Sequence, residues 1–134
     1  MKVFFDTNVL VSAFTTRGLC ADLLRLVLAE HEVQTGAVNL TELRRVLRQR
    51  FRAPAAAVDA AVQVLRQSTI IPKPKEPSDL PVEDPDDAWV LASAIAGQAD
   101  ILVTGDRDLL AIAPTAPLRI LDPRGLWTLL RPSR

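Results

Sequence analysis

Cysteine and histidine are nearly absent from the sequence, which contains one residue of each, Cys20 and His31. With a single cysteine the chain has no internal disulfide bond, so small disulfide-stapled secreted scaffolds are excluded and a reducing, cytoplasmic location is expected. Both residues lie in or next to a predicted apolar helix, where we expect structural roles. Zinc centres and catalysis by Ser-His or Cys-His pairs are therefore disfavoured.

Long hydrophobic runs are missing too. No apolar stretch approaches the ~20 residues of a membrane-spanning helix, and the run at residues 2–5 is too short for a signal peptide. We therefore expect no membrane contact. The chain has 134 residues, of which 49% are hydrophobic, and this suffices for a buried core. Residues 1–134 are expected to form a single domain.

Net charge is zero, because 16 acidic residues balance 16 basic ones. The balance hides a segregation, since residues 1–75 carry a net charge of +5, residues 76–108 carry −8 and residues 109–134 carry +3. Thirteen of the cations are arginines, whose planar head groups suit phosphate contacts better than lysine does. Total charge gives no argument for a nucleic-acid partner, but acids and arginines each concentrate in their own segment.

Apolar stretches of strand length and of helix length alternate along the chain. Strands are predicted at residues 2–5, 32–35, 69–71, 100–106 (a strand followed by a turn) and 118–121. Helices are predicted at residues 8–14, 19–30, 38–52, 54–67, 84–96 and 122–130. Residues 72–85 contain five prolines and are predicted to form a surface loop. The alternation predicts an α/β fold with a mostly parallel sheet.

Two of the predicted strands lead directly into an aspartate. Residues 3–5 are followed by Asp6, and residues 101–105 are followed by Asp106. Ligands of open parallel sheets bind outside the carboxyl ends of the strands, so both carboxylates are well placed for function. Either aspartate alone is better explained as a turn or capping residue.

Two further acids stand at the starts of predicted helices. Glu42 lies in the first turn of its helix, at the edge of the apolar face, where pairing with Arg45 would also explain it. In the helix at residues 84–96, Asp84 is a good N-cap. Asp87, unlike its neighbour Asp86, shares a face with apolar residues and is therefore predicted to point inward.

Acids at two strand ends and two helix starts converge on one edge of the predicted sheet. Carboxylates held close together repel one another, and one of them stays protonated unless a cation intervenes. A cluster made only of carboxylates suits a hard cation, Mg²⁺ or Mn²⁺. The chemistry that this favours is attack of a metal-activated water on a phosphoester.

These residues resemble the motifs of the PIN-domain family of metal-dependent ribonucleases. The four motif-like stretches occur in the family's order, at residues 6–13, 41–47, 84–94 and 101–110. The resemblance implies a three-layer fold, with a mostly parallel central sheet and helices on both faces. A bare domain of this length is similar to the toxin halves of bacterial VapBC-type toxin–antitoxin pairs. This similarity implies a VapC-like endoribonuclease with an RNA substrate, an antitoxin partner and a homodimeric state.

By position, the resemblance also implies the site residues. The catalytic quartet would be Asp6, Glu42, Asp87 and Asp106. Asp6, Asp87 and Asp106 would bind Mg²⁺ or Mn²⁺, with Glu42 and Asp108 as further candidate ligands, and Asn8 and Thr104 would support them. One departure is visible, because many members carry a serine several residues before the second acid, where this chain has Gly36-Ala37.

A group of arginines begins directly after Glu42. Its members are Arg44, Arg45, Arg48, Arg50 and Arg52. Their position beside the predicted metal site suits contacts with RNA phosphates, and a solvated helix face explains them equally well.

Three alternative functions remain open from the residues alone. A phosphatase of the haloacid-dehalogenase type would need an aspartate where the chain has Asn8, and a receiver domain would need a lysine after Lys75, where none follows. A PIN-like module that binds a partner without catalysis would not need all four acids. A metal-dependent assay on labelled RNA separates these readings.

Overall fold

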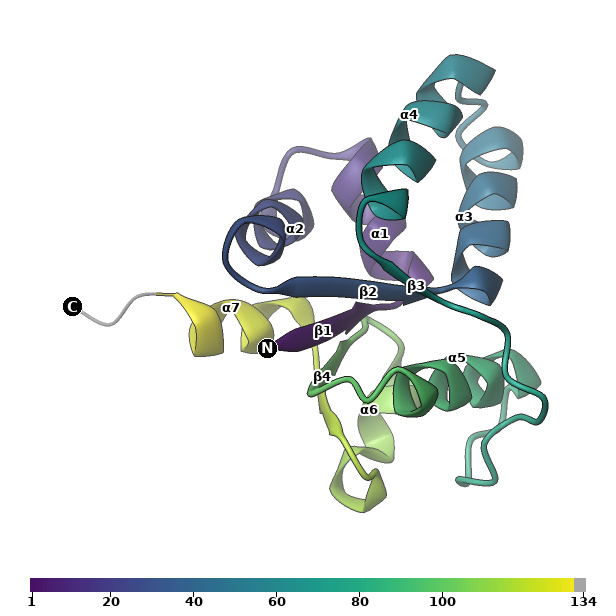
Figure 1. Cartoon of the computed structure of the whole chain (residues 1–134), viewed down its shortest axis with the longest axis vertical. Helices are drawn as coiled ribbons and strands as arrows, with labels where there is room; N and C mark the ends of the chain where they lie inside the picture. The colour runs from purple at the N-terminus through teal and green to yellow at the C-terminus, as the bar shows by residue number, and fades with distance from the viewer. Residues whose placement is uncertain (132–134) are drawn as a thin grey trace.

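The computed structural model describes residues 1–131, in which five parallel strands form one sheet in the order β3-β2-β1-β4-β5 (Figure 1). The strands are β1 (Lys2–Phe5), β2 (Glu32–Gly36), β3 (Thr69–Ile71), β4 (Ile101–Val103) and β5 (Arg119–Leu121). The helices are α1 (Thr7–Thr15), α2 (Leu19–Glu30), α3 (Ala37–Gln49), α4 (Ala55–Arg66), α5 (Pro85–Ala96), α6 (Arg107–Ala111), the 3-10 turn η1 (Ala113–Thr115) and α7 (Pro123–Leu130). Within this range no helix combines the length and apolarity needed to cross a bilayer.

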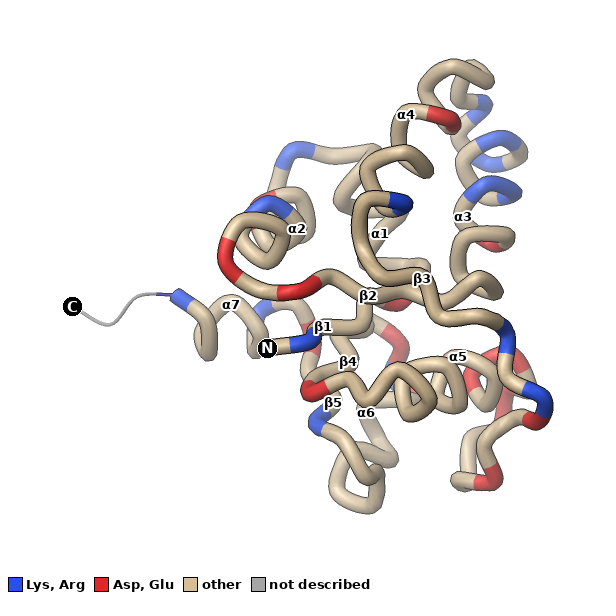
Figure 2. The backbone as a smooth tube through the Cα atoms, viewed as in Figure 1, with Lys and Arg blue, Asp and Glu red and all other residues tan. Residues whose placement is uncertain are grey.

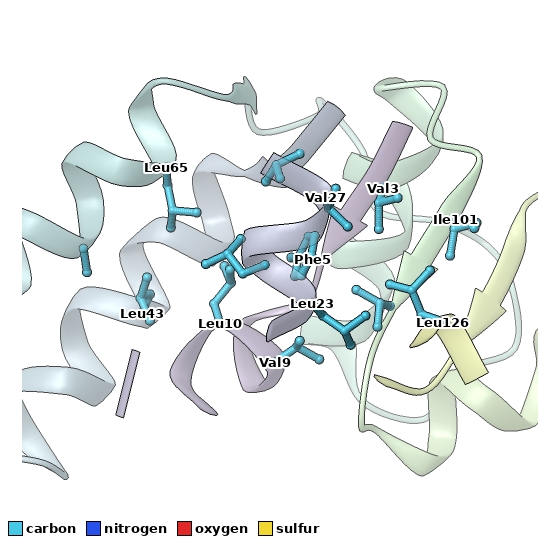
Figure 3. Packing of buried hydrophobic residues seen from close by; sticks show 14 of the residues in the cluster. Val3, Phe5, Val9, Leu10, Leu23, Val27, Leu43, Leu65, Ile101 and Leu126 are labelled. Atoms are coloured by element: carbon cyan, nitrogen blue, oxygen red, sulfur yellow. The ribbon is translucent and has the colours of Figure 1, made fainter. Parts of the chain in front are cut away.

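Both faces of the sheet are covered by helices. Neighbouring residues of a strand point to opposite faces, and the central strand β1 is apolar on both. Val3 and Phe5 join a buried cluster with side chains of α1, α2, α3, α4 and α7 (Figure 3). Phe4 joins a second cluster with side chains of α5 and α6. Figure 1 shows α1 to α4 on one side of the sheet and α5 and α6 on the other, which confirms the predicted three-layer α/β fold.

The order of the strands places a topological switch beside β1. The chain runs from β1 outward through β2 to β3, then crosses to β4 on the opposite side of β1 and ends at β5. Phe5 is paired with Val103, so the residues that follow β1 and β4 leave the sheet side by side. Ligands of such sheets bind at this crevice, and the fold brings Asp6 and Thr104 there.

Two local predictions need correction. The helix predicted to reach Arg52 ends at Gln49, and Phe51 beyond it is 47% exposed. The chain leaves the helix there, and Arg52 adopts a positive φ of 50°, which is incompatible with a continuing helix. Helix α6 and the turn η1 were not predicted, because segments of five and three residues are too short to show a helical period. Residues 72–84 carry no helix or strand, as predicted for the loop.

Candidate metal centre

Asp6 lies at the centre of the site, between the end of β1 and the start of α1. It is 5% exposed and accepts four hydrogen bonds. Its Oδ1 accepts from the backbone N–H of Thr7 at 2.7 Å and from Asn39 Nδ2 at 3.2 Å. Its Oδ2 accepts from Thr104 Oγ1 at 2.7 Å and from Asn8 Nδ2 at 3.4 Å. All its partners donate, so the surroundings of Asp6 are built for an ionised carboxylate.

Burial and charge act against those hydrogen bonds. Removal from water raises the pKa of Asp6, and the nearby charge of Asp106 raises it further. The hydrogen bonds from Thr104, Thr7 and Asn8 lower it. The net pKa is raised, so the folded protein holds this negative charge at a cost in free energy.

Thr104 and Asn8 join the ends of β1 and β4. The Thr104 hydroxyl donates to Asp6 and accepts from the backbone N–H of Asp106 at 3.0 Å. Asn8 Oδ1 accepts from the backbone N–H of Gly105 at 3.0 Å. Both side chains therefore position Asp6 relative to Asp106. Their supporting role at the site stays a prediction.

Asp106 also belongs to a group of three acids that lie close together. Asp87, Asp106 and Asp108 can each offer one carboxylate oxygen such that all three atoms lie within 4.8 Å of one another. Asp106 is the N-cap of α6, where its Oδ1 accepts from the backbone N–H of Asp108 at 2.8 Å. Asp108 is exposed on the first turn of that helix. Three oxygen ligands at this spacing suit a divalent cation.

Asp87 is the acid with the least support from the protein. It is 6% exposed, which confirms the predicted inward orientation, and its Oδ2 has no hydrogen-bond partner. Burial raises the pKa of Asp87 to about 7, with further contributions from the charges of Asp106, Asp84 and Asp6. An unpartnered, buried carboxylate oxygen facing other carboxylates is costly in the protein alone, and a bound cation would remove that cost.

Glu42 borders the same site from α3. Its side chain is half-buried, and burial together with the charge of Asp6 raises its pKa, while Arg45 lowers it. Glu42 lines a cleft of about 340 Å³ that also contains Asp86 of α5. Figure 2 shows acidic positions gathered around the start of α5 and basic positions along α3. Glu42 therefore lies next to the acidic site but is not one of the three acids whose oxygens lie within 4.8 Å of one another.

The predicted arginine group is not a single surface. Arg44 forms an ion pair with Asp59 of α4, with 3.9 Å between the charged atoms. Arg45 lines the cleft beside Glu42, and Arg48 is exposed on α3. Arg50 caps α3 and Arg52 lies beyond it, both exposed. Their contact with RNA stays a prediction.

Asn39 is a site residue that the sequence reasoning missed. It is 1% exposed, and its Nδ2 donates to Asp6 Oδ1 and, at 2.9 Å, to the Thr7 hydroxyl. Asn39 precedes Glu42 by three residues, so the two share a face of α3. A polar residue one turn before a candidate acid, on an otherwise apolar face, was the signal that could have identified it.

The metal-free protein is expected to become more stable as the pH falls from about 8 to 5. Asp87 has a pKa of about 7 in the folded protein against 3.8 for an unperturbed aspartate, so between these two pH values the native state binds more protons than the unfolded state. This contribution is complete below 3.8 and is lost as the pH rises through about 7. Melting temperatures in EDTA across this range test it.

Asp87→Asn is the control for the pH series, because it removes the titrating group. Its melting temperature should depend less on pH than that of the wild type. A wild-type melting temperature that rises from pH 5 to pH 8 would contradict the raised pKa.

Comparison with known proteins agrees with this architecture. Residues 2–108 match the family model described as PIN domain. The VapBC2 structure from Rickettsia felis, bound to a promoter DNA fragment, superimposes with a TM-score of 0.66 at 17% identity, covering 91% of this chain and 98% of that one. PAE2754 from Pyrobaculum aerophilum gives 0.66 at 19% identity, with coverages of 97% and 89%. VapC20 from Mycobacterium tuberculosis, a Sarcin-Ricin loop cleaving toxin, gives 0.58 at 18% identity, with coverages of 81% and 93%.

At these low identities the solved structures show only that the fold is shared. The relationship in sequence is shown by the family model, which matches residues 2–108. No curated protein matches the chain. The matched range begins in the strand that leads into Asp6, contains Glu42 and Asp87, and ends at Asp108, so it includes every acid of the site. The chain belongs to the PIN domain family.

Proposed function

We propose that the protein is an endoribonuclease that uses Mg²⁺ or Mn²⁺ to hydrolyse RNA phosphodiester bonds. The observation that carries the proposal is Asp87 Oδ2, a buried carboxylate oxygen without a partner that belongs to a group of three acids able to share one cation. Protein donors satisfy Asp6 but leave this oxygen free, and the donor set consists of oxygens only. Such a set favours magnesium or manganese over zinc.

The residues that would hold the ion are Asp87 and Asp106, with Asp108 as a further ligand. Asp6, which lies close enough for its charge to raise the pKa of Asp87, would be a further candidate ligand. When bound, such an ion lowers the pKa of a water and neutralises charge on the attacked phosphate. The chain itself contributes the fixed placement of Asp6 by Thr104 and Asn8.

The biological role belongs to the same proposal. VapC20 is described as a toxin that cleaves the Sarcin-Ricin loop, and VapBC2 was solved with promoter DNA. Their fold covers most of this chain, which supports a toxin of a toxin–antitoxin pair. The proposal includes an antitoxin partner, a homodimeric state and a cytoplasmic location.

The proposal is tested by incubating the purified protein with labelled single-stranded and structured RNAs, in Mg²⁺, in Mn²⁺ and in EDTA. We expect endonucleolytic products with either metal and none in EDTA. Equal cleavage in EDTA would overturn the metal mechanism. RNA binding without cleavage in either metal would favour a non-catalytic PIN-like module. Release of phosphate from a phosphomonoester alone would favour an aspartate-based phosphatase.

Arginines of α3 are expected to contribute to RNA affinity through the phosphate backbone. Arg45→Ala combined with Arg48→Ala should weaken binding and reduce the slope of log affinity against log salt by about 0.7 for each lost phosphate contact on a single strand. Arg25→Ala is the matched control, because this exposed arginine on α2 already pairs with Asp22. An unchanged slope in the double variant would show that Arg45 and Arg48 do not contact RNA phosphates and only form a solvated helix face.

A further inference from the structure

The cleft beside the acids contains an aromatic ring that the proposed chemistry does not use. Trp89 of α5 lines it together with Glu42, Arg45, Lys73 and Asp86, and the indole is partly exposed. Asn39 also borders the cleft and donates a hydrogen bond to Asp6. One side chain therefore separates the cleft from the centre of the acidic site, so a substrate whose phosphate lies at the acids can extend into the cleft.

Lys73 covers one face of this ring. Its ammonium lies 4.5 Å from the centroid of Trp89. Lys73 is exposed and comes from the proline-containing loop that follows β3, and its long side chain can move away without changing the fold. Stacking of a nucleobase on an aromatic ring is stronger than an exposed cation–π contact. A base can therefore take the place of the ammonium, which then remains close to a neighbouring phosphate.

The charges around the ring exclude a simple phosphate pocket. Arg45 and Lys73 favour an anion, but Glu42 and Asp86 line the same cleft and would repel one placed deep inside it. An uncharged aromatic group meets no such repulsion, while phosphates on either side of it can reach the two cations. A nucleotide within a single strand of RNA fits this description, because its base is uncharged and is flanked by two charged phosphates.

We propose that the cleft binds one unpaired nucleobase of the RNA, stacked on Trp89, with Arg45 and Lys73 contacting the flanking phosphates. The inference rests on the proposed RNA substrate and assigns Trp89 as a residue that positions the strand for cleavage. A purely structural role is the competing explanation, in which Lys73 only fastens the loop at residues 72–84 to α5. In that case RNA binding leaves the indole unaffected.

Fluorescence of Trp89 distinguishes the two roles. The chain has two tryptophans, and the other one, Trp127 of α7, packs against the buried cluster that contains Val3 and Phe5. In a Trp127→Phe variant, a short single-stranded RNA titrated in EDTA should quench the remaining Trp89 emission in a saturable way. The same backbone carrying abasic positions should not. The matched control is Trp89→Phe, which keeps Trp127 and should show no quenching with either oligonucleotide.

Affinity gives the second readout. Trp89→Ala should weaken binding of labelled RNA about tenfold by fluorescence anisotropy, while Trp89→Phe, which keeps a stacking ring, should retain most of the affinity. Circular dichroism checks that both variants fold, and the quenching experiment does not depend on either of them. RNA that binds the wild type without quenching Trp89, or equal quenching by the abasic oligonucleotide, would overturn the inference.

The same RNA is then incubated with Mn²⁺, which separates this inference from the proposed function. Cleavage without base-dependent quenching overturns the base site and leaves the nuclease in place. Base-dependent quenching without cleavage supports the base site and overturns the nuclease.

Discussion

Asp87→Asn is expected to reduce metal-dependent RNA cleavage by more than ~100-fold, because loss of a metal ligand exceeds the effect of losing a supporting residue. The same change should stabilise the metal-free protein at pH 8, by an amount on the order of 2 kcal/mol. The physical reason is that the wild-type carboxylate is buried, has an unpartnered Oδ2 and lies beside Asp106, which together raise its pKa to about 7. An amide is uncharged and can donate to Asp106.

Asp86→Asn is the matched control for this prediction. Asp86 is adjacent on the same helix but exposed, and Asp84 already provides the N-cap by accepting from the Asp86 N–H at 2.9 Å. Loss of a first-turn acid should cost only ~0.3–1 kcal/mol through the helix dipole. The variant should still cleave RNA in Mn²⁺ and melt slightly lower. An inactive Asp86→Asn beside an active Asp87→Asn would contradict the assignment of the metal ligand on α5.

Asp6→Asn should also lose activity, but with the opposite effect on stability. Asp6 accepts four hydrogen bonds, and an amide would place donor hydrogens against Thr104 or against Asn39 and the Thr7 N–H. A broken buried hydrogen bond to a charged group costs about 1.5–3 kcal/mol. We expect the loss of these hydrogen bonds to outweigh the gain from removing a buried charge whose pKa is raised, and therefore expect a lower free energy of unfolding in urea at pH 8 without metal.

Thr104→Ser and Thr104→Val provide the control for the Asp6 environment. Serine keeps the hydroxyl that donates to Asp6 at 2.7 Å, whereas valine keeps the shape of threonine and removes this donor. Thr104→Ser should remain close to the wild type in stability, and Thr104→Val should fall toward Asp6→Asn. Asp6 is held by four hydrogen bonds, whereas Asp87 Oδ2 has none. Equal stability of Asp6→Asn and Asp87→Asn would contradict the stabilising role assigned to the hydrogen bonds of Asp6.

The positions of the acids could be predicted from the sequence because they follow simple rules. Apolar strands that end in Asp6 and Asp106 indicate the ligand edge of a parallel sheet, and the structure confirms that Asp6 and Thr104 meet there. Helical periodicity distinguished Asp87 from Asp86 correctly, because a 100° step separates a buried position from an exposed one.

Most of the remainder depended on tertiary contacts, whose partners a local pattern does not identify. Asn39 reaches Asp6 only because β2 lies beside β1, and this adjacency is a property of strand order. The end of α3 was predicted three residues late, because arginine, glutamine and phenylalanine all tolerate a helix and the nearest helix-breaking residue, Pro54, comes only after Arg52. The cleft at Trp89 is formed by α3, the loop after β3 and α5, which are distant in sequence.

Thermal melting at pH 8 with and without Mn²⁺ tests most directly whether these acids form a metal site. A ligand that binds only the folded state raises stability by RT ln(1 + [L]/Kd), about 2.7 kcal/mol at a concentration of 100 times Kd. Titration of Mn²⁺ into the wild type should therefore raise the melting temperature in a saturable way, and the same titration into Asp87→Asn should raise it little or not at all. Equal shifts in both proteins, or no shift in the wild type, would contradict a metal centre built on Asp87.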